Sequence, residues 1–462
     1  MGKTVTVLVD GEQRMVEAGT RLSTVLDIEQ PCGGRGTCGK CTVTVDGETV
    51  LACQYAVERD IEVQTAQTGK IVSETGVATD GRLTDHRCFV LDIGTTTLAL
   101  ALVSLDERRV VKVLTADNPQ RRFGADIITR IDCCRQYGIT PLHDTLTTAI
   151  NRLIERMGTT ADRLYAAGNV TMLHTLFAAD CTSIGVAPYT PAFLESRTES
   201  AETVGISGVN TVVSLPSVAS FVGADIVAGL HLVGAPADGR YDLLVDLGTN
   251  AEVVLFSAEG GVATAAAAGP CFEGANIRCG QSATAGAVCA FRLQDGAPSY
   301  ETVGGKAATG ICGTGLIDLI AELLADGIID ESGYMESDYV LCDGVYLSCD
   351  DVRQYQPAKA AVYAAIVSLM KTENIGYDRI DRLYLSGGFS ANIRVDSAVR
   401  TGLLPAELAD RVVVLNNSSL QGAIRYACEG GDLKRIADTV RYVDLAASPY
   451  FADLFMEHMT FE

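Results

Sequence analysis

Four cysteines lie close together near the N-terminus, in the glycine-rich stretch PCGGRGTCGKCTVTVDGETVLACQ, which spans residues 31–54. Their spacing is C-x5-C-x2-C, followed by eleven residues and a fourth cysteine, and the four are Cys32, Cys38, Cys41 and Cys53. Cysteine thiolates in such a loop can hold an iron–sulfur cluster. The alternatives are a four-cysteine zinc site, although zinc sites usually pair two C-x2-C units and only one is present, and a disulfide knot. Fifteen cysteines in a chain without an apolar signal region favour metal or redox chemistry over disulfides.

The segments beside the cysteines predict the fold that would hold them. VTVLVDGEQRMVEA and TVTVDGETVLAC each predict a hairpin with an Asp-Gly turn, and TRLSTVLDI predicts a short helix opened by Thr20. This order of hairpin, helix, cysteine loop and hairpin resembles the β-grasp [2Fe–2S] ferredoxins over residues 1–66. The loop glycines let backbone N–H groups approach sulfides, and Arg35 and Lys40 add positive charge beside an anionic cluster. The resemblance implies that the four cysteines bind a [2Fe–2S] cluster.

A repeated pattern begins after a polar, glycine- and threonine-rich stretch, residues 67–87, which we expect to be a linker. FVLDIGTTTLALAL (residues 89–102) and LLVDLGTNAEVVLF (residues 243–256) share one plan, an apolar strand, Asp-x-Gly-Thr and a second apolar strand. Equivalent residues lie at a constant offset of 154 positions. The repeat predicts a duplicated domain whose halves, residues 88–235 and 236–462, face each other across a cleft.

The two Asp-x-Gly-Thr turns have residue types suited to a phosphate site. Glycine lets the backbone approach a phosphate, threonine hydroxyls and N–H groups can donate to its oxygens, and aspartates can hold Mg²⁺ through water. The predicted binding residues are Gly94, Thr95, Thr96, Gly248, Thr249 and Asn250, and the predicted catalytic carboxylates are Asp92 and Asp246. A third strand, in RLYLSGGFSANI (residues 382–393), runs into Gly387, Gly388 and Phe389, where the backbone can pass beside an adenosine.

Three further carboxylates allow two interpretations each. Asp126 and Asp225 both occur in Gly-Ala-Asp-Ile, where they are either catalytic groups near the γ-phosphate or helix N-caps, a position that aspartate favours. Glu273, in GPCFEGAN, either contacts nucleotide or partner or is an ordinary turn carboxylate. We expect the other eleven cysteines to be structural, because cysteine is a common small buried residue.

The three strand-and-turn segments resemble the phosphate 1, phosphate 2 and adenosine motifs of the acetate and sugar kinase/Hsp70/actin (ASKHA) superfamily. DNPQRRFGADIITRI (residues 117–131), AAGPCFEGANIRCG (residues 267–280) and GICGTGLIDLIAELL (residues 310–324) are similar to stretches of the reductive activators of corrinoid proteins. Those proteins join a [2Fe–2S] ferredoxin to such an ATPase. The resemblance implies a mixed α/β and α+β fold, with an N-terminal β-grasp ferredoxin domain followed by a duplicated actin-like ATPase module.

The resemblance also implies an enzyme that couples an ATPase to low-potential electron transfer, with a [2Fe–2S] cluster, ATP and Mg²⁺. Its reaction would be the reduction of a Co(II) corrinoid to Co(I). Its partners would be a low-potential reductant and a corrinoid protein or corrinoid-dependent methyltransferase system, and a homodimer stays open. One alternative is an ATP-driven donor to another low-potential enzyme, like the activators of 2-hydroxyacyl-CoA dehydratases. Another is a non-enzymatic, ATP-switched factor for metal or cofactor assembly.

Charge and hydropathy exclude other classes of function. The net charge of −22 opposes binding to nucleic acid or to an anionic membrane, since phosphate recognition needs a basic surface. No run of 18 apolar residues is present, so no membrane span is expected. We therefore expect a cytoplasmic protein.

Overall fold

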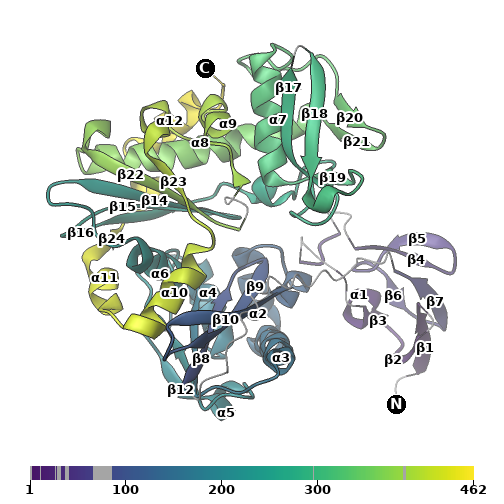
Figure 1. The fold of residues 1–462 in the computed structure, drawn as a ribbon. Coiled ribbons are helices and arrows are strands. Elements are labelled where there is room, and N and C mark those ends of the chain that lie inside the picture. The colour runs from purple at the N-terminus through teal and green to yellow at the C-terminus, as the bar shows by residue number, and fades with distance from the viewer. Residues whose placement is uncertain are drawn as a thin grey trace. The chain divides into compact units, whose positions relative to one another are not determined.

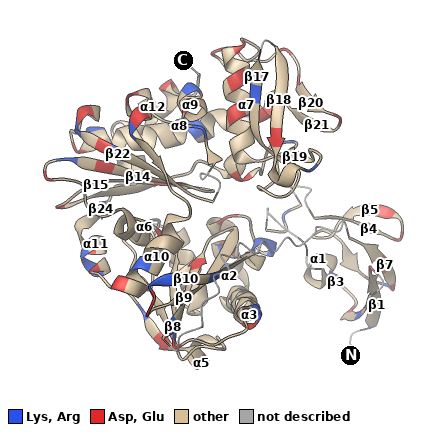
Figure 2. Ribbon diagram, in the orientation of Figure 1, with Lys and Arg blue, Asp and Glu red and all other residues tan. Residues whose placement is uncertain are grey.

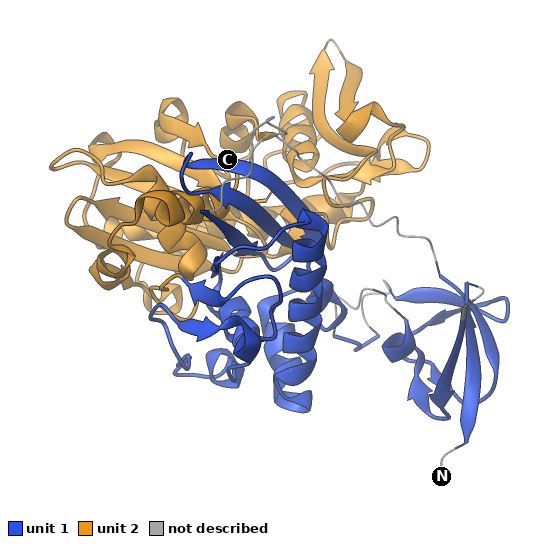
Figure 3. Cartoon of the chain, turned by 60° about the horizontal axis from the view of Figure 1, so that its bottom comes forward, with its two compact units in different colours: residues 1–214 blue, residues 215–462 orange. Residues whose placement is uncertain are grey.

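The computed structural model describes residues 3–10, 12–26, 28, 33–36, 41–65, 86–294, 296–388 and 392–461. The chain forms two compact units, residues 1–214 and residues 215–462 (Figure 3). Of the predicted linker only its last two residues, His86 and Arg87, are described, and Arg87 already begins a strand. The predicted domain boundaries stay a prediction. Across the described ranges, no helix combines the length and the apolar character needed to cross a membrane.

The N-terminal part of the first unit is a mixed five-stranded sheet of order β2-β1-β7-β4-β5 (Figure 1). Strand β1 pairs antiparallel with β2 and parallel with β7, which is the predicted β-grasp arrangement. The elements are β1 (Thr4–Val9), β2 (Glu12–Glu17), β3 (Thr20–Arg21), α1 (Leu22–Val25), β4 (Thr42–Val45), β5 (Glu48–Leu51), β6 (Ala56–Val57) and β7 (Ile61–Gln64). Val5, Val7 and Val9 are buried because alternate residues of a strand share one face.

Both predicted hairpins are confirmed, as β1–β2 and β4–β5. In the second, Asp46 and Gly47 have φ angles of 49° and 88°, and two positive φ angles give a two-residue turn the twist that paired strands need. The predicted helix start at Thr20 is wrong. Thr20 lies in β3 and its hydroxyl donates to the Glu17 carbonyl, while α1 begins at Leu22 after Arg21, without a side-chain cap.

Two six-stranded sheets confirm the predicted duplication. The first unit contains β8 (Arg87–Ile93), β9 (Thr97–Ser104), β10 (Arg109–Asp117), β11 (Arg163–Gly168), β12 (Thr198–Ser200) and β13 (Thr211–Ser214), in the order β10-β9-β8-β11-β13-β12. The second contains β14 (Tyr241–Leu247), β15 (Ala251–Ser257), β16 (Gly260–Ala266), β22 (Ile380–Ser386), β23 (Val412–Val414) and β24 (Val440–Tyr442), in the order β23-β22-β14-β15-β16-β24. In each, a three-stranded antiparallel meander starts at a strand that also pairs in parallel with a later one.

Helices cover these sheets. Those of the first unit are α2 (Ile127–Tyr137), α3 (Thr140–Met157), α4 (Val170–Leu176) and α5 (Ala201–Val204). Those of the second are α6 (Ala224–Val233), α7 (Gly313–Ala325), α8 (Cys349–Thr372), α9 (Val395–Arg400), α10 (Ser418–Glu429), α11 (Leu433–Thr439) and α12 (Phe451–Glu457). The second unit adds the short strands β17 (Ala287–Gln294), β18 (Ala297–Thr302), β19 (Gly310–Ile311), β20 (Tyr339–Cys342) and β21 (Val345–Leu347).

Strand β14 is apolar on both faces because both are covered. Leu243 and Val245 belong to the core that includes residues of α7 and α8, whereas Leu244 belongs to a second core with Ile226 and Leu230 of α6. A strand that is buried on both faces has a continuous run of apolar residues, which explains the apolar run from which the sequence predicted this strand.

A buried histidine ties α4 to the segment that follows it. The His174 ring stacks on Phe193 with 4.4 Å between centroids, and the side chain is fully buried. Its Nε2 accepts the Ala192 N–H at 2.9 Å, so Nδ1 carries the proton and donates to the Val170 carbonyl at 2.7 Å. Burial lowers the pKa of His174, because the charged ring would lose its hydration and Nε2 would gain a hydrogen facing a donor.

We predict that His174 makes the protein less stable in acid. Its folded pKa lies below the unfolded value of about 6.5, so its contribution is complete above that pH and is lost as the pH falls toward the folded pKa. His174→Gln should lower the free energy of unfolding at pH 7.5 by about 1–3 kcal/mol and weaken its dependence on pH. Urea unfolding at pH 7.5 and pH 5.5 measures both. His86→Gln, at an exposed site, is the control, and an unchanged pH dependence in His174→Gln would contradict the prediction.

Candidate functional site

The β4–β5 hairpin brings two of the predicted cluster ligands together. Cys41 directly precedes β4 and Cys53 follows β5, and the Ala52 N–H donates to the Cys41 carbonyl at 2.9 Å. Both cysteines are buried, with 2% and 1% of their surface exposed. Cys32, Cys38 and Lys40 lie outside the described residues. The short interval between the third and fourth cysteines is therefore the length of one tight hairpin, and the four-cysteine ligand set stays a prediction.

The described part of the cysteine loop has a backbone that suits close wrapping. Gly33, Gly34 and Gly36 have φ angles of 61°, 79° and 76°, a region that residues with a side chain rarely adopt. The Gln54 amide donates to the Gly34 carbonyl at 2.7 Å and lies 3.5 Å from the Cys53 sulfur. Donors of this kind near a ligand sulfur tune a cluster's potential, so the buried thiols and their surroundings fit an iron–sulfur cluster.

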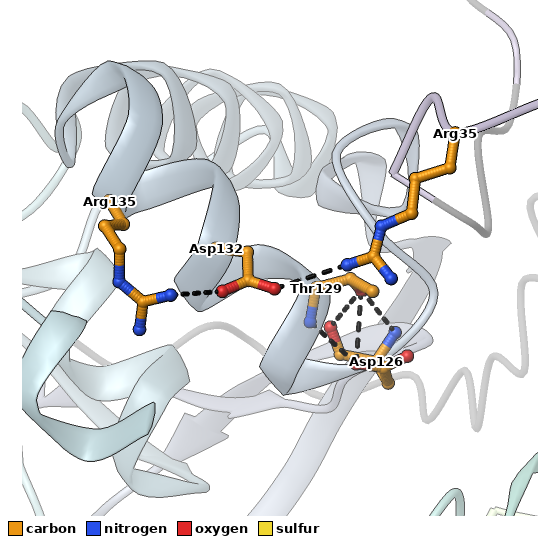
Figure 4. A network of polar contacts seen from close by, with 5 residues as sticks. All are labelled: Arg35, Asp126, Thr129, Asp132 and Arg135. Carbon is orange, nitrogen blue, oxygen red and sulfur yellow. Dashed lines mark hydrogen bonds and ion pairs between the residues drawn. The ribbon is translucent and has the colours of Figure 1, made fainter. Parts of the chain in front are cut away.

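One contact of this loop reaches α2 (Figure 4). The Arg35 guanidinium lies 3.3 Å from the Asp132 carboxylate, which also accepts from Arg135 at 2.6 Å. The Arg35 and Asp132 side chains are 60% and 40% exposed, so solvent screens the pair and it adds little stability. Arg35, which we expected to add charge beside the cluster, thus has a carboxylate partner.

The phosphate turn predicted in the first unit is held from the inside by buried polar groups. The Gly94 N–H donates to the Thr97 carbonyl at 2.9 Å, and a Cβ at Gly94 would lie 2.7 Å from that oxygen. Asn118 donates to the Gly94 carbonyl at 2.8 Å, and its backbone N–H donates to the Thr96 carbonyl at 2.8 Å. The carbonyl oxygens of Gly94, Thr96 and Thr97 therefore all accept hydrogen bonds from within the protein.

A buried guanidinium supports the centre of the same turn. Arg130 of α2 is fully buried and its Nη2 donates to the Thr95 carbonyl at 2.6 Å, while its Nε donates to the Gly124 carbonyl at 3.0 Å. Asn169 donates to the Thr95 hydroxyl at 3.2 Å. A fixed positive charge behind a glycine turn favours an anion in front of it. The sequence analysis missed Arg130, because one arginine in a helix carries no motif.

The equivalent turn in the second unit is acidic. The Gly248 N–H donates to the Asn250 carbonyl at 2.8 Å, and Asp246 of β14 is paired across the sheet with Glu252 of β15. Burial raises the pKa of Glu252 well above its usual range. Nearby carboxylates raise it further, and these belong to Asp225, Asp246 and Glu273. Glu252 is a fourth acid that the sequence analysis missed, and its signal was a charge within an otherwise apolar strand.

Glu273 contacts one of the predicted binding residues. The Thr249 hydroxyl donates to the Glu273 carboxylate at 2.7 Å. A contact of Glu273 with nucleotide or partner stays a prediction. The hydrogen of the Thr249 hydroxyl is thus directed to Glu273, so in this arrangement the hydroxyl presents lone pairs, not a proton, to a ligand. This differs from the expected donation to phosphate oxygen and suits contact with a cation.

The two Gly-Ala-Asp-Ile aspartates have different positions. Asp126 is the N-cap of α2, and its carboxylate accepts the Thr129 N–H at 2.8 Å in a capping box (Figure 4). Asp225 is not an N-cap, since α6 is capped by Gly223 and Asp225 lies in the first turn. Its carboxylate accepts the Ile226 N–H at 2.9 Å and lies near enough to Glu252 to raise the pKa of that acid. The catalytic roles of both aspartates stay predictions.

The glycines of the predicted adenosine motif lie beside the acidic turn of the second unit. Strand β22 pairs with β14 so that Ser386 is next to Asp246. Gly387 follows with a φ of 123°, and a Cβ there would lie 2.0 Å from the Leu247 carbonyl, so only glycine fits. Gly388 has open space around it, whereas Phe389 lies outside the described residues.

Metal binding by side chains alone is not evident among the described residues. No group of three or more His, Cys, Asp or Glu side chains there is placed to hold an ion. Mg²⁺ is usually bound through one or two carboxylates together with water and substrate phosphates, so this observation does not test the predicted Mg²⁺.

Comparisons with known proteins agree over most of the chain. One family model, described as the RACo middle region, matches residues 88–235, and another, the C-terminal domain of RACo or ASKHA domain, matches residues 240–462. The chain is 25% identical to the corrinoid activation enzyme RamQ of Eubacterium limosum, covering 98% of this chain and 97% of that protein. It is 23% identical to a Methanosarcina barkeri protein named [Co(II) methylated amine-specific corrinoid protein] reductase, covering 80% and 76%.

A solved structure shares the fold over nearly the whole length. It is titled reductive activator for corrinoid, iron–sulfur protein, and it matches with a TM-score of 0.74 and 26% identity. The match covers 99% of this chain and 98% of that one.

We predict that Arg130 is essential to the structure of the first turn. Arg130→Met should lower the free energy of unfolding by about 2–4 kcal/mol, because the buried Thr95 and Gly124 carbonyls lose their donor. Arg135→Met, on the same helix but 48% exposed, is the matched control and should change it by less than about 0.5 kcal/mol. Urea unfolding measures both, and equal losses in the two variants would refute the assignment.

Proposed function

Because this chain belongs to the reductive activators of corrinoid proteins, a family of enzymes, we propose that it reduces the Co(II) corrinoid of a partner protein to Co(I) in an ATP-dependent reaction. The observation that carries the proposal is the presence of two kinds of site on one chain. A cysteine loop with buried thiols precedes a duplicated fold in which each half ends its central strand in an Asp-x-Gly-Thr turn.

The cysteine loop is the proposed route of the electron. A [2Fe–2S] cluster bound by Cys32, Cys38, Cys41 and Cys53 would pass single electrons at a potential near about −400 mV. The chain's own part is to bury the sulfurs of Cys41 and Cys53 and to place the Gln54 amide beside one of them. The electron comes from a low-potential one-electron donor and ends on Co(II), so one electron enters and one leaves in each turnover.

The duplicated module is the proposed source of energy. For one electron, each 59 mV of unfavourable potential costs a factor of ten in the equilibrium. The family resemblance implies that reducing Co(II) to Co(I) requires a potential below that of the proposed cluster. ATP supplies the difference only if it binds one conformation of the protein or complex better than another. A kinase acting on a metabolite would need no cysteine loop, and a downhill electron carrier would need no ATP.

We propose that the two Asp-x-Gly-Thr turns bind different parts of Mg²⁺-ATP. In the first unit, Gly94, Thr95 and Thr96 form a turn backed by a buried cation, which suits phosphate oxygens. In the second, Asp246 and its acidic neighbours suit Mg²⁺, whose charge would offset their mutual repulsion. Residues proposed to complete the site are Asp92, Asp126, Asp225, Gly248, Thr249, Asn250, Gly387, Gly388 and Phe389.

The proposed domains correspond to these two functions, electron transfer and ATP binding. Residues 1–66 form the electron-carrying domain, residues 67–87 join it to the module, and residues 88–235 and 236–462 are the two halves. The proposed partners are a corrinoid protein or corrinoid-dependent methyltransferase system and a low-potential reductant. We place this activity in the cytoplasm.

The cluster is tested by iron content and absorption. Anaerobically purified protein should contain about two irons and two labile sulfides per chain, with visible absorption bands. Cys41→Ser and Cys53→Ser should each lose the bands, because a buried ligand is removed. Cys279→Ser, at a cysteine outside the loop, is the control. Zinc in place of iron, or bands that survive in both loop variants, would contradict the proposal.

Variants that lose either the cluster or the ATP site test whether ATP hydrolysis is coupled to cobalt reduction. Given a low-potential reductant and a corrinoid protein held as Co(II), the protein should form Co(I), followed by absorption, only with Mg²⁺-ATP present. Cys38→Ser should keep ATP hydrolysis and lose reduction, whereas Asp246→Asn should keep the cluster and lose ATP-dependent reduction. Glu259→Gln, on the exposed turn after β15, should change neither. Equal rates and extents of reduction without ATP would exclude energy coupling.

A further inference from the structure

Asn169, the first residue after β11, lies beside the proposed phosphate turn of the first unit. Strands β8 and β11 pair in parallel, and their last residues, Ile93 and Gly168, are partners in the register. The carboxyl ends of parallel strands meet at one edge of a sheet, so the residues that follow them meet there too. Gly168 has a φ of 153°, and a Cβ there would lie 2.7 Å from the Ile93 carbonyl oxygen, so glycine allows this close approach.

The helix that Asn169 begins fixes the orientation of its amide. Asn169 is the N-cap of α4, and its Oδ1 accepts the Met172 N–H at 3.0 Å. A backbone N–H can only donate, so the amide atom that faces Met172 is the oxygen, and the other end of the amide is Nδ2. This Nδ2 donates to the Thr95 hydroxyl at 3.2 Å.

The bond from Asn169 determines where the Thr95 hydroxyl hydrogen points. An amide nitrogen accepts no hydrogen bond, so Thr95 Oγ1 accepts from Asn169 and its own hydrogen points elsewhere. Among the described residues, Asn169 is the one hydrogen-bond partner of this hydroxyl. Strand β9, which follows the turn, contains no Asp or Glu and is tan in Figure 2. The half-buried hydroxyl therefore keeps its hydrogen for a ligand, and the ligand that suits a donor is an anion.

The equivalent threonine of the second unit has the opposite arrangement. Thr249 lies 154 positions after Thr95, and its hydroxyl donates to the Glu273 carboxylate at 2.7 Å. A hydroxyl hydrogen rotates to suit its partners, so a donor beside Thr95 and an acceptor beside Thr249 turn the two hydroxyls in opposite senses. The direction of each hydroxyl is thus set by a residue outside the repeated motif.

We infer that Asn169 is a positioning residue that directs the Thr95 hydroxyl hydrogen toward a phosphate oxygen of ATP. The inference rests on the proposed function, and it adds the residue that sets the direction of one phosphate contact. Asn169 itself does not touch the nucleotide and acts through Thr95. Hydrogen bonds to a charged oxygen are stronger than those between neutral groups, so a hydroxyl that is free to turn away loses affinity.

Equilibrium binding of Mg²⁺-ATP, measured by titration calorimetry in a double-mutant cycle, tests this role. Thr95→Val removes the hydroxyl and should weaken binding about tenfold or more, whereas Thr95→Ser keeps it and should bind within about threefold of wild type. Asn169→Ser keeps a capping oxygen but removes the amide donor, and it should weaken binding about threefold to tenfold. In the Thr95→Val background, Asn169→Ser should have no further effect, because the hydroxyl through which Asn169 acts is gone.

A matched control is Asn151→Ser. The Asn151 amide also bonds in both directions, donating to the Gly205 carbonyl and accepting the Ser207 N–H, each at 2.9 Å. These contacts do not include the turn, so Asn151→Ser should change the affinity for Mg²⁺-ATP by less than about twofold.

The outcomes separate this inference from the proposed function. A wild-type protein that does not bind Mg²⁺-ATP would refute the proposed function and this inference with it. Wild-type binding together with equal losses from Asn169→Ser in the wild-type and Thr95→Val backgrounds would refute only the positioning role, since equal losses indicate a general change in α4. An unchanged affinity in Asn169→Ser would refute it as well. If Asn169→Ser fails to fold by circular dichroism, Asn169→Gly replaces it in the same cycle, because glycine is tolerated at an N-cap.

Discussion

A glycine turn at the end of a buried strand can bind a ligand through its outward backbone groups only if its inward carbonyl and N–H groups have hydrogen-bond partners within the protein. Both halves of the module depend on this constraint. In the first unit it is met by Asn118 and Arg130, which occupy the carbonyls of the turn from inside. In the second, the Gly248 N–H closes the turn on the Asn250 carbonyl. The carboxylates Asp92 and Asp246 stand one residue before the end of their strands, so their positions follow from the same two strands.

Duplication has produced two halves that share the arrangement of five sheet strands and have opposite local charge. The sixth strand differs, since β12 pairs with β13 at one edge and β24 pairs with β16 at the other. The strand position paired with Asp92 is Ala99, whereas the position paired with Asp246 is Glu252. A buried cation lies behind the first turn, and several carboxylates gather at the second. The surroundings of the first turn thus suit an anion, and those of the second suit a cation.

Helix α7 connects the elements of the second unit that carry the proposed nucleotide contacts. Its first turn packs so closely on the chain that a Cβ at Gly313 would lie 2.0 Å from the Phe272 carbonyl, and Phe272 directly precedes Glu273. Its middle carries the carboxylates that hold Arg394. Helix α7 therefore contacts the residue next to Glu273, whose carboxylate accepts from Thr249, and it also contacts Arg394.

The sequence by itself determined the strands, the hairpins and the duplication. Continuous apolar runs, Asp-Gly turns and a constant offset are local or repeated patterns, and each reflects burial or turn geometry that a few neighbouring residues specify. It also pointed to Asp246, Gly248 and Gly387, and at Gly387 glycine is demanded by the close contact with the Leu247 carbonyl. The helix start at Thr20 was wrong because the β3–β6 pairing placed that residue in a strand.

Only the tertiary structure decided which side chains support these turns. Arg130, Glu252 and Arg394 act on residues 35, 6 and 72 positions away in the chain, respectively on Thr95, Asp246 and Glu322. Of these pairs, only Asp246 and Glu252 are close in the sequence, and Glu252 is recognisable there as a charged residue within an apolar strand. Asp126 and Asp225 share one tetrapeptide, yet one caps its helix and the other lies beside Glu252. The shared tetrapeptide cannot distinguish them, because the two helices begin at different positions relative to it: Asp126 precedes α2 and is capped in return by Thr129, whereas α6 begins one residue before Asp225.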